Sequence, residues 1–331
     1  MTPGSQTLGG PVLEVEDLTV AFPVRDGGGR EGTRRVVAGV SYALAFGRTL
    51  GVVGESGCGK SMTALALLGL VPPPGRMTGS IRFAGRELIG QSRTDWQALR
   101  GDRVAMVFQE PMTALNPVMT VGRQIAEVAV LHDGLSWREA KGRAISMLEA
   151  VGIPSPRERA DAYPHQMSGG MRQRAMIAMA LACRPALLVA DEPTTALDVT
   201  IQAQILDLMQ ALQEETGTAI QFISHNLAVV SEVSHEIIVM YAGRIVERSP
   251  ADALFDQPLH PYTIGLIETL PDPARRAELL PTIPGTVDLR ARSGCRFADR
   301  CRRGDAGCRE AEPALEEYAP GHFAACFKVG Q

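Results

Sequence analysis

The sequence contains little cysteine, no excess of basic residues and no long apolar run. Its net charge of −4 implies no overall basic surface and so gives no case for nucleic-acid binding. The longest clean apolar runs, such as ALALLGLV at 64–71, fall far short of the ~20 residues that a membrane-spanning helix requires. Residues 1–11 have neither a basic stretch nor an apolar core, so we expect a disordered N-terminus rather than a signal peptide. These absences favour a cytosolic protein, soluble or peripheral to a membrane.

Only six of the 331 residues are cysteine, yet four of them lie near the C-terminus. They are Cys295, Cys301, Cys308 and Cys326. In a reducing compartment, clustered cysteines are more often metal ligands or redox centres than disulfides. The C-x5-C, C-x6-C and C-x17-C spacings lack the C-x2-4-C pairs typical of structural zinc, whereas iron–sulfur clusters accept widely varying spacings. Spacing alone leaves a cluster, zinc and unligated thiols open.

The order of the elements predicts an α/β protein with a mostly parallel sheet. Strand patterns at 12–22 and 36–46 flank the charged stretch RDGGGREGTRR, which we interpret as a solvated hairpin tip. Short apolar strands at 49–54 and 186–191 belong to a region where strands alternate with helical patterns, as in sheets with crossover helices. We find no internal repeat, so the α/β unit is present once.

The chain divides into a sheet domain at 12–250 and a Pro-, Arg- and Cys-rich module at 251–331. Within the sheet domain, residues from about 111 to 168 read as a helical insertion. Ser136 and Glu139 have the S-x-x-E spacing of a capping box, which predicts that a helix of this insertion begins there.

GESGCGKS at 54–61 has the spacing of a phosphate-binding loop, G-x-x-x-x-G-K-[ST], between an apolar strand and a predicted helix. Glycines let consecutive backbone N–H groups curl around phosphate oxygens, and the helix N-terminus adds the positive end of its dipole. Lys60 would reach the β- and γ-phosphates, and the Ser61 hydroxyl would ligate Mg²⁺. The candidate nucleotide-binding residues of this loop are Gly54, Glu55, Ser56, Gly57, Cys58, Gly59, Lys60, Ser61 and Met62.

ALLVADEP at 186–193 is an apolar strand that ends in two acids. Asp191, at the end of the strand, would hold Mg²⁺ directly or through water. Glu192 would then orient or deprotonate an attacking water. Strands often end in acids, but together with the phosphate loop this motif indicates the second half of a nucleoside-triphosphate site.

Further motifs accompany these two. MSGGM at 167–171 precedes ALLVADEP, and ALD at 196–198 and ISH at 223–225 follow it. With GESGCGKS and the strand-terminal Gln109, they resemble the motif set of ABC-transporter ATPases over residues 12–250, in order and in spacing. The resemblance implies that the nucleotide is ATP. It also implies a P-loop, RecA-like core with an antiparallel N-terminal β subdomain, an inserted helical subdomain and, beyond the core, the small Cys-rich module.

The resemblance also implies roles for single residues. Gln109 would contact Mg²⁺ and the attacking water, and His225 would contact the γ-phosphate. Asp198 corresponds to the D-loop acid, and Phe22 lies where the family places an aromatic residue that stacks on adenine. The catalytic residues implied in this way are Glu192, His225, Gln109 and Lys60, and the Mg²⁺ ligands are Ser61, Gln109 and Asp191.

MSGGM departs from the family's commonest signature, LSGGQ, by Met167 and Met171. Ser168, Gly169 and Gly170 remain, and their backbone and hydroxyl groups would bind phosphate at the start of a helix. In this family the signature acts in trans, so that two chains enclose two ATP molecules. The resemblance therefore implies a second ABC ATPase subunit, homologous but not identical, as a partner.

The tail resembles one branch of the family. DQPLHPYTIGLIETLP at 256–271, FQEPMTALNPVMTVGRQI at 108–125 and LVADEPTTALDVTIQAQIL at 188–206 are similar to ATPase subunits of oligopeptide, dipeptide and nickel importers. The nickel members are usually shorter, so the long tail favours peptides. The resemblance implies two transmembrane permease subunits, an extracytoplasmic peptide-binding protein, no nucleic acid, and a place on the cytoplasmic face of the cell membrane.

The GC-x-F-x-x-RC…C…C pattern is similar to that of peptide-importer ATPases that carry a four-iron four-sulfur (4Fe–4S) cluster. The resemblance therefore implies that Cys295, Cys301, Cys308 and Cys326 ligate one 4Fe–4S cluster. Six arginines surround the first two of them: Arg290, Arg292, Arg296, Arg300, Arg302 and Arg303. We expect these arginines to form a solvated basic face; the alternative is that some neutralise the thiolates.

Other functions are less consistent with these motifs. An importer for nickel or another small solute would use the same ATPase. A soluble ABC ATPase of repair or translation commonly has two ATPase units or a long coiled-coil insertion, and neither occurs in this sequence. A different P-loop enzyme, such as a kinase, would lack MSGGM and the histidine of ISH.

Overall fold

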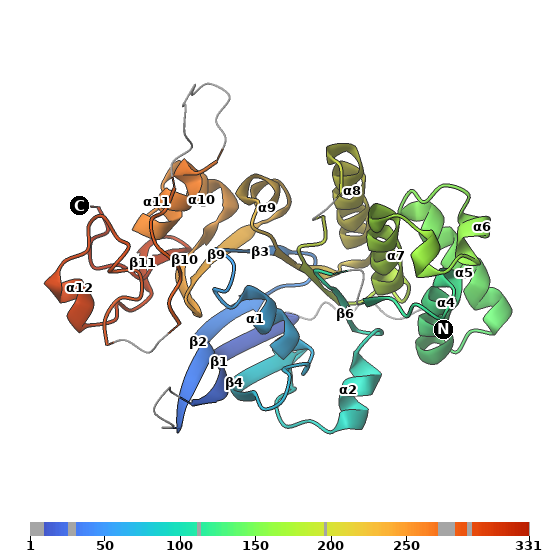
Figure 1. Ribbon diagram of the computed structural model, residues 1–331, viewed down its shortest axis with the longest axis horizontal. Helices are drawn as coiled ribbons and strands as arrows, with labels where there is room; N and C mark the ends of the chain where they lie inside the picture. Colours follow the sequence, from blue (N-terminus) through green and yellow to red (C-terminus); the bar gives the residue numbers. More distant parts are fainter. Residues whose placement is uncertain are drawn as a thin grey trace.

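The structure, a computed structural model, describes residues 10–25, 31–110, 114–194, 197–270, 282–289 and 293–330. Most of the predicted N-terminal segment therefore lies outside the described residues. Two sheets form the centre of the molecule, with a group of helices at one end and the C-terminal region at the other (Figure 1). Among the described residues, no helix combines the length and the apolar character needed to cross a bilayer.

The N-terminal part forms a four-stranded antiparallel sheet in the order β2-β1-β4-β5. Its strands are β1 (Leu13–Arg25), β2 (Glu31–Leu44), β4 (Arg76–Phe83) and β5 (Arg86–Glu87). Arg25 pairs with Glu31, which agrees with the predicted hairpin, although its tip at 26–30 lies outside the described residues. This sheet confirms the predicted antiparallel β subdomain.

The second sheet has eight strands in the order β11-β12-β10-β9-β3-β8-β7-β6. Parallel pairing joins five of them: β3 (Thr49–Val53), β6 (Val104–Val107), β7 (Leu187–Asp191), β8 (Ala219–Ile223) and β9 (Glu236–Tyr241). Every residue of β3, β6, β7 and β8 is buried, which explains why these strands are mostly apolar instead of alternating. The connecting helices are α1 (Lys60–Leu67), α2 (Arg93–Leu99), α7 (Gly169–Leu181), α8 (Val199–Thr216) and α9 (Leu227–Val233).

The helices at one end of the molecule fall within the predicted insertion. They are α4 (Val121–Asp133), α5 (Trp137–Ala150), α6 (Pro156–Ala160) and the 3₁₀ helix η1 (Pro164–Gln166). The predicted capping box is present: the Ser136 hydroxyl accepts the N–H of Glu139, and the Glu139 carboxylate accepts the N–H of Ser136. Residues 111–113 of the insertion lie outside the described residues.

The C-terminal region joins the large sheet. After β10 (Arg244–Pro250), which runs antiparallel to β9, the elements are α10 (Ala251–Asp256), α11 (Pro261–Glu268), α12 (Ala306–Glu310), β11 (Glu316–Ala319) and β12 (His322–Ala324). Strand β12 pairs with β10, with Glu247 opposite Ala324, and β11 pairs with β12. The boundary that we predict at 250 is therefore crossed by one continuous sheet.

A buried carboxylate reinforces this connection. Glu247 on β10 is 0% exposed. Its oxygens accept the backbone N–H groups of Leu259 and His260, both at 2.8 Å, and lie 2.8 Å from Nε2 of His322 on β12. Two segments of the tail thus meet around one charge of the large sheet.

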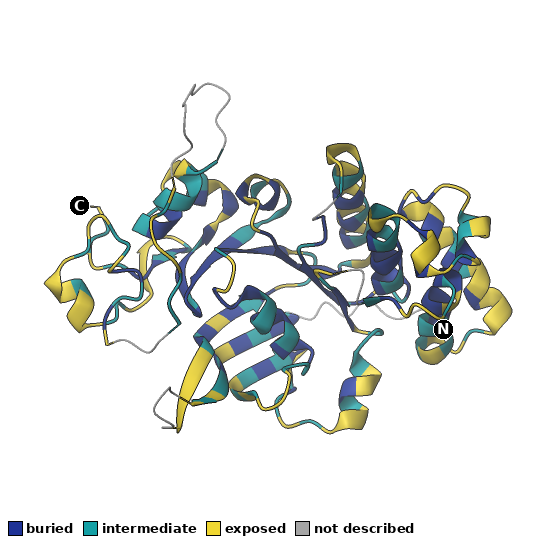
Figure 2. Ribbon diagram, viewed as in Figure 1, coloured by how far each residue is buried: buried dark blue, intermediate teal, exposed yellow. Residues whose placement is uncertain are grey.

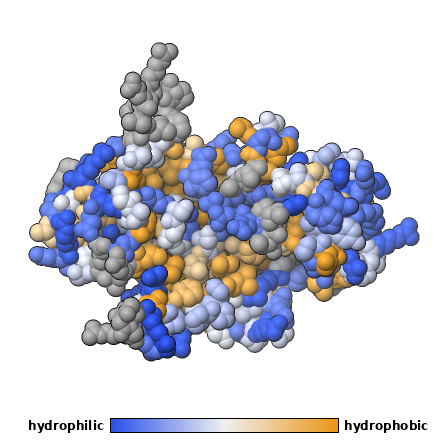
Figure 3. Space-filling view, viewed as in Figure 1, coloured by the Kyte–Doolittle hydropathy of each residue, from blue (hydrophilic) through white to orange (hydrophobic). Residues whose placement is uncertain are grey.

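Burial is highest along the strands of the large sheet and lowest on the outer helices at both ends (Figure 2). On the face shown in Figure 3, apolar side chains gather across the middle of the molecule, above the four-stranded sheet, whereas the two ends are mostly polar.

Candidate nucleotide site

The parallel strands bring the candidate site residues to one edge of the sheet. Strand β3 leads into the phosphate-binding loop, β7 ends at Asp191, and β8 leads into His225. Gln109 follows β6 by two residues and is exposed. Because neighbouring parallel strands are in register, for example Val52 with Ile223, their carboxyl ends lie next to one another.

The glycines of the loop at 54–61 have the conformations that such a loop needs. Gly54, Gly57 and Gly59 all have positive φ values, of 147°, 80° and 106°. A Cβ at Gly59 would lie 2.7 Å from the carbonyl oxygen of Val36, whereas a Cβ at Gly57 would meet nothing within 4 Å. The loop is therefore packed against its neighbours on one side and open at Gly57.

Lys60, the first residue of α1, is buried and folds back over its own loop. Its Nζ donates to the carbonyl oxygens of Gly54, at 2.6 Å, and Glu55, at 3.1 Å. The ammonium group thus lies inside the curve of the loop, where a phosphate group would be close to it.

Asp191 has the environment expected of a metal ligand. The side chain is 3% exposed, and its Oδ1 has no hydrogen-bond partner among the described residues. Burial raises the pKa of Asp191, and the Glu192 charge raises it further, while a hydrogen bond with Ser61 and the charge of Lys60 lower it. A buried, unpartnered carboxylate oxygen beside a serine hydroxyl fits Mg²⁺, which prefers oxygen ligands and uses only one or two carboxylates.

Glu192 and His225 lie beside each other at the ends of β7 and β8. His225 Nδ1 is 3.2 Å from Glu192 Oε2. The His225 side chain is 61% exposed and that of Glu192 is 11% exposed. Glu192 has a positive φ of 51°, and its N–H donates to the carbonyl of Ile223 at 2.9 Å. A non-glycine residue in this conformation is uncommon and is often found at functional sites.

Phe22 lies half-buried on β1, within the fringe of the N-terminal core. A Cβ added to Gly75 would lie 2.7 Å from its ring, so the ring packs against the turn after α1. Its stacking on adenine stays a prediction.

The signature residues are exposed at the start of α7. Ser168 caps this helix by accepting the N–H of Met171 at 3.3 Å, and a Cβ at Gly169 would meet nothing within 4 Å. Met167 is buried in the core, so its difference from the common leucine is a change of core packing. Asp198 caps α8 by accepting the N–H of Ile201 at 3.0 Å and is also exposed. These helix starts are open to contact with another chain.

The four clustered cysteines line one small cavity, together with His260, Phe297, Arg303 and Lys328. No disulfide joins any of the cysteines, and burial raises the pKa of the Cys295 thiol to about 11. Within the described part of the chain, no group of three or more His, Cys, Asp and Glu side chains is arranged to hold a single metal ion. The four cysteines are thus gathered around one space.

The expectation of a solvated arginine face is wrong for two of the six arginines. Arg296 is 3.1 Å from Glu312, and Arg300 pairs with Glu55 of the phosphate-binding loop. Their side chains are only 12% and 7% exposed. Arg296 also reaches the carbonyl of Ala242, and Arg300 reaches the carboxylate of Glu55, both within residues 12–250. Arg302 is 76% exposed, and Arg303 lines the thiol cavity. Arg290 and Arg292 lie outside the described residues.

Sequence reasoning missed that the tail contacts the phosphate-binding loop. The Tyr262 hydroxyl accepts the N–H of Glu55 at 2.7 Å, and both nitrogens of the Arg300 fork bind the Glu55 carboxylate. The motif HPY, which contains Tyr262, was a signal that this residue matters, but no pattern in the sequence points to Arg300.

Comparisons with known proteins agree with this geometry. The ABC transporter family profile matches residues 37–195, and the profile "Oligopeptide/dipeptide transporter, C-terminal region" matches residues 246–308. The chain is 52% identical to the "Probable peptide ABC transporter ATP-binding protein y4tR" of Sinorhizobium fredii, over 97% of this chain and 96% of that protein. It is 49% identical to the oligopeptide transport ATP-binding protein OppD of Salmonella typhimurium, over 96% and 93% of the two chains. It is 48% identical to the dipeptide transport ATP-binding protein DppD of Escherichia coli, over 95% and 96%.

Solved structures show the same fold. A dimeric ATP-binding cassette, MJ0796, bound to ADP and Pi, superposes with a TM-score of 0.65 at 24% identity, over 72% of this chain and 98% of that one. The subunit cbiO1 of Clostridium perfringens, from an ABC transporter complex, has a TM-score of 0.59 at 25% identity, over 75% and 91%. With its P-loop core, its antiparallel β subdomain and relatives that match almost its whole length, the chain belongs to the ABC transporter ATP-binding proteins of the oligopeptide/dipeptide type.

Proposed function

We propose that this chain binds and hydrolyses ATP to power an ABC importer of dipeptides or oligopeptides. The observation that carries the proposal is the meeting of Lys60, Asp191, Glu192 and His225 at one sheet edge, in a chain that aligns with peptide-transport ATPases over nearly all of its length. The match of residues 246–308 to the oligopeptide/dipeptide transporter C-terminal region supports peptides over nickel as the cargo.

The residues divide the chemistry among them. The loop amides and Lys60 would bind the phosphates, and Ser61 and Asp191 would hold Mg²⁺, with Gln109 at its edge. Bound there, Mg²⁺ supplies positive charge against the phosphate oxygens. Glu192 would accept a proton from the water whose oxygen attacks the γ-phosphorus. His225, beside Glu192, is placed to contact the same phosphate.

The exposed ends of α7 and α8 support action in trans. Ser168, Gly169 and Gly170 would complete the ATP site of a homologous, non-identical ATPase subunit, and Asp198 would lie at the same junction.

Three large apolar residues in and beside α4 and α5 are exposed: Val118 at 79%, Leu131 at 69% and Trp137 at 50%. Exposed apolar side chains that gather in one patch mark contact sites, and α4 and α5 pack against each other. We assign this surface to two permease subunits, which would place the chain on the cytoplasmic face of the membrane and link it indirectly to a peptide-binding protein.

The four cysteines around one cavity are the observation that supports a 4Fe–4S cluster at Cys295, Cys301, Cys308 and Cys326. Among the described residues, no three or more His, Cys, Asp and Glu side chains are arranged to hold a single metal ion. The cavity that the four thiols line measures about 20 Å³. The metal content and the acid-labile sulfide content of protein purified without oxygen distinguish a cluster from zinc and from free thiols.

The transport proposal is tested by purifying the chain with its permeases and partner ATPase and measuring ATP hydrolysis in proteoliposomes. We expect hydrolysis to rise when the binding protein is loaded with a di- or oligopeptide, and Lys60→Ala to abolish ATP binding by this chain. Stimulation by nickel but not by peptides would assign the other cargo. Isolation of the chain on DNA or ribosomes, without permeases, would contradict the proposal.

A further inference from the structure

Glu55 of the phosphate-binding loop is held through every polar group that it has. Its carbonyl accepts from Lys60 Nζ at 3.1 Å, and its N–H donates to the Tyr262 hydroxyl at 2.7 Å. Its carboxylate accepts from both terminal nitrogens of Arg300, at 2.6 and 2.9 Å. Lys60 belongs to the loop itself, whereas Tyr262 and Arg300 belong to the tail. The first turn of the loop is therefore fixed largely by residues that lie outside the ATPase core.

Arg300 is itself held in one orientation. Beyond Glu55, it donates to the carbonyls of Pro284, at 2.6 Å, and Ile283, at 3.3 Å. Its guanidinium lies 5.7 Å from the ring of Tyr241 and 5.9 Å from that of Phe297. A two-pronged arginine–carboxylate pair, here 7% exposed at the arginine and 29% at the glutamate, has a geometry that lysine cannot reproduce.

Tyr262 is fixed by its surroundings in the same way. It is 0% exposed, with ring centroids 4.8 Å from Tyr241 and 5.3 Å from Phe297. Its backbone N–H donates to Nδ1 of His260 at 3.0 Å. The hydroxyl that meets Glu55 is thus carried by a ring that cannot shift without disturbing the core.

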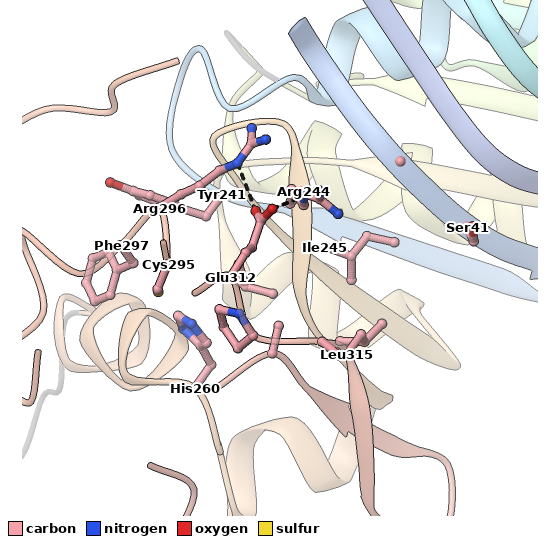
Figure 4. Close-up of a pocket in the computed structure, with 15 residues that line it drawn as sticks. Ser41, Tyr241, Arg244, Ile245, His260, Cys295, Arg296, Phe297, Glu312 and Leu315 are labelled. Atoms are coloured by element: carbon pink, nitrogen blue, oxygen red, sulfur yellow. Dashed lines mark hydrogen bonds and ion pairs between the residues drawn. The ribbon is translucent and has the colours of Figure 1, made fainter. Parts of the chain in front are cut away.

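A second contact reaches the other end of the loop. The N–H of Gly243, in the turn between β9 and β10, donates to the carbonyl of Cys58 at 2.8 Å. The carbonyl of the preceding residue, Ala242, accepts from Arg296, whose side chain also binds Glu312 (Figure 4). Glu312 in turn pairs with Arg244 at 2.8 Å. Arg296 therefore fixes the turn that holds Cys58.

Both arginines belong to one short segment, 295–301, which begins and ends with a cysteine. Its backbone is closed by hydrogen bonds from Ala298 N–H to the Cys295 carbonyl, at 3.1 Å, and from Cys301 N–H to the Ala298 carbonyl, at 3.3 Å.

From these contacts we infer that Arg300 and Tyr262 are positioning residues for ATP binding, because they hold Glu55 and with it the phosphate-binding loop. This inference rests on the proposed nucleotide site. Neither Arg300 nor Tyr262 touches the reacting atoms. Substitution of either residue should therefore change the affinity for ATP more than the rate of the chemical step.

The test uses the full chain in its complex with the permeases and the partner ATPase, with ATP titration and steady-state hydrolysis as readouts. We expect Arg300→Gln and Tyr262→Phe each to weaken ATP binding about tenfold, within the usual range of coupling between sites. KM should rise to match while kcat stays within about twofold, since binding common to ground and transition states is lost. A purely structural role would instead lower the fraction of active protein, and hence kcat, at unchanged KM.

A double-mutant cycle and a matched control make the test specific. Arg300→Gln combined with Glu55→Gln should bind ATP no more weakly than Arg300→Gln alone, since the two share one interaction. Arg302→Gln, two residues along and largely exposed, should bind ATP normally.

If Arg300→Gln fails to fold, Tyr262→Phe, which keeps the buried ring, carries the test. Normal ATP affinity in Tyr262→Phe or Arg300→Gln, with loss in Lys60→Ala, would overturn this inference alone. Normal affinity in Lys60→Ala as well would overturn the proposed nucleotide site.

Discussion

His225 and Glu192 are paired, with Nδ1 of the imidazole 3.2 Å from the carboxylate Oε2. The two residues come from adjacent parallel strands and meet only because both strands end at the same sheet edge. Glu192 is mostly buried and His225 mostly exposed, so the carboxylate can hold the ring in place while the ring faces solvent. This arrangement suits a base next to a group that contacts phosphate.

We predict that Glu192→Gln leaves ATP binding intact and lowers turnover at least ~100-fold, the scale for loss of a general base. The amide keeps the shape of the side chain but cannot take a proton from water. ATP affinity and single-turnover hydrolysis measure the two effects separately. Glu215→Gln, which changes an exposed acid on α8 paired with Arg184, is the control and should hydrolyse ATP normally. Near-normal turnover in Glu192→Gln would contradict the assigned role.

Ser168→Ala and Ser136→Ala form a matched pair. Each serine caps a helix by accepting a backbone N–H three residues ahead, so each change should lower the free energy of unfolding by about 1 kcal/mol. Only Ser168 lies in the signature, so only Ser168→Ala should also reduce ATP hydrolysis by the assembled complex. Urea unfolding and hydrolysis assays on both variants provide the comparison. Equal hydrolysis by the two variants would remove the signature role of Ser168.

His260 makes stability depend on pH. Burial lowers its pKa to about 3, from 6.5 in an unfolded chain. Below pH 6.5 the unfolded chain therefore binds a proton that the folded chain does not, and stability falls as the pH falls toward 3, by up to about 1.4 kcal/mol per pH unit. His260→Asn keeps a helix cap without the titration and should lose about 2 kcal/mol less than wild type between pH 7 and pH 5. An unchanged slope in His260→Asn would refute the assignment.

The cysteines are tested by substitution. If Cys295, Cys301, Cys308 and Cys326 hold a cluster, replacing any one with serine should remove most of the iron and the visible absorption of anaerobically purified protein. Cys183→Ser, outside the cavity, is the control and should leave both unchanged. A wild-type protein without iron, or one with zinc alone, would rule the cluster out.

Local patterns predicted much of the fold and the central motifs. The loop 54–61, the acid-ended strand at 186–191 and the capping box at Ser136 each depend on neighbours within a few residues, and the structure has the corresponding strands and helix starts where the motifs place them. The parallel order of the strands also followed from their alternation with helices. These features are encoded by periodicity and by short-range hydrogen bonds, which a sequence displays directly.

Long-range pairs of charges were not predictable in the same way. Arg300 and Glu55 are 245 residues apart, and an arginine beside five others resembles a solvated face until its carboxylate partner is seen. The strands at Glu316–Ala319 and His322–Ala324 are too short and too mixed in character to show a pattern, so their pairing with β10 emerged only in three dimensions. Tertiary contacts of this kind depend on topology, which no local rule contains.

The sheet that joins the tail to the core is completed late in the synthesis of the chain. Glu247 and its partner His322 are 75 residues apart, so a ribosome that adds 5–20 residues per second needs about 4–15 s to supply the histidine. During that interval β10 is an unpaired sheet edge, and Glu247 has not yet met His322. Unpaired strand edges of this kind promote aggregation. Strand β12 thus covers the β10 edge of the sheet on which the ATP site is built, and a nascent chain released before β12 is made would leave that edge bare.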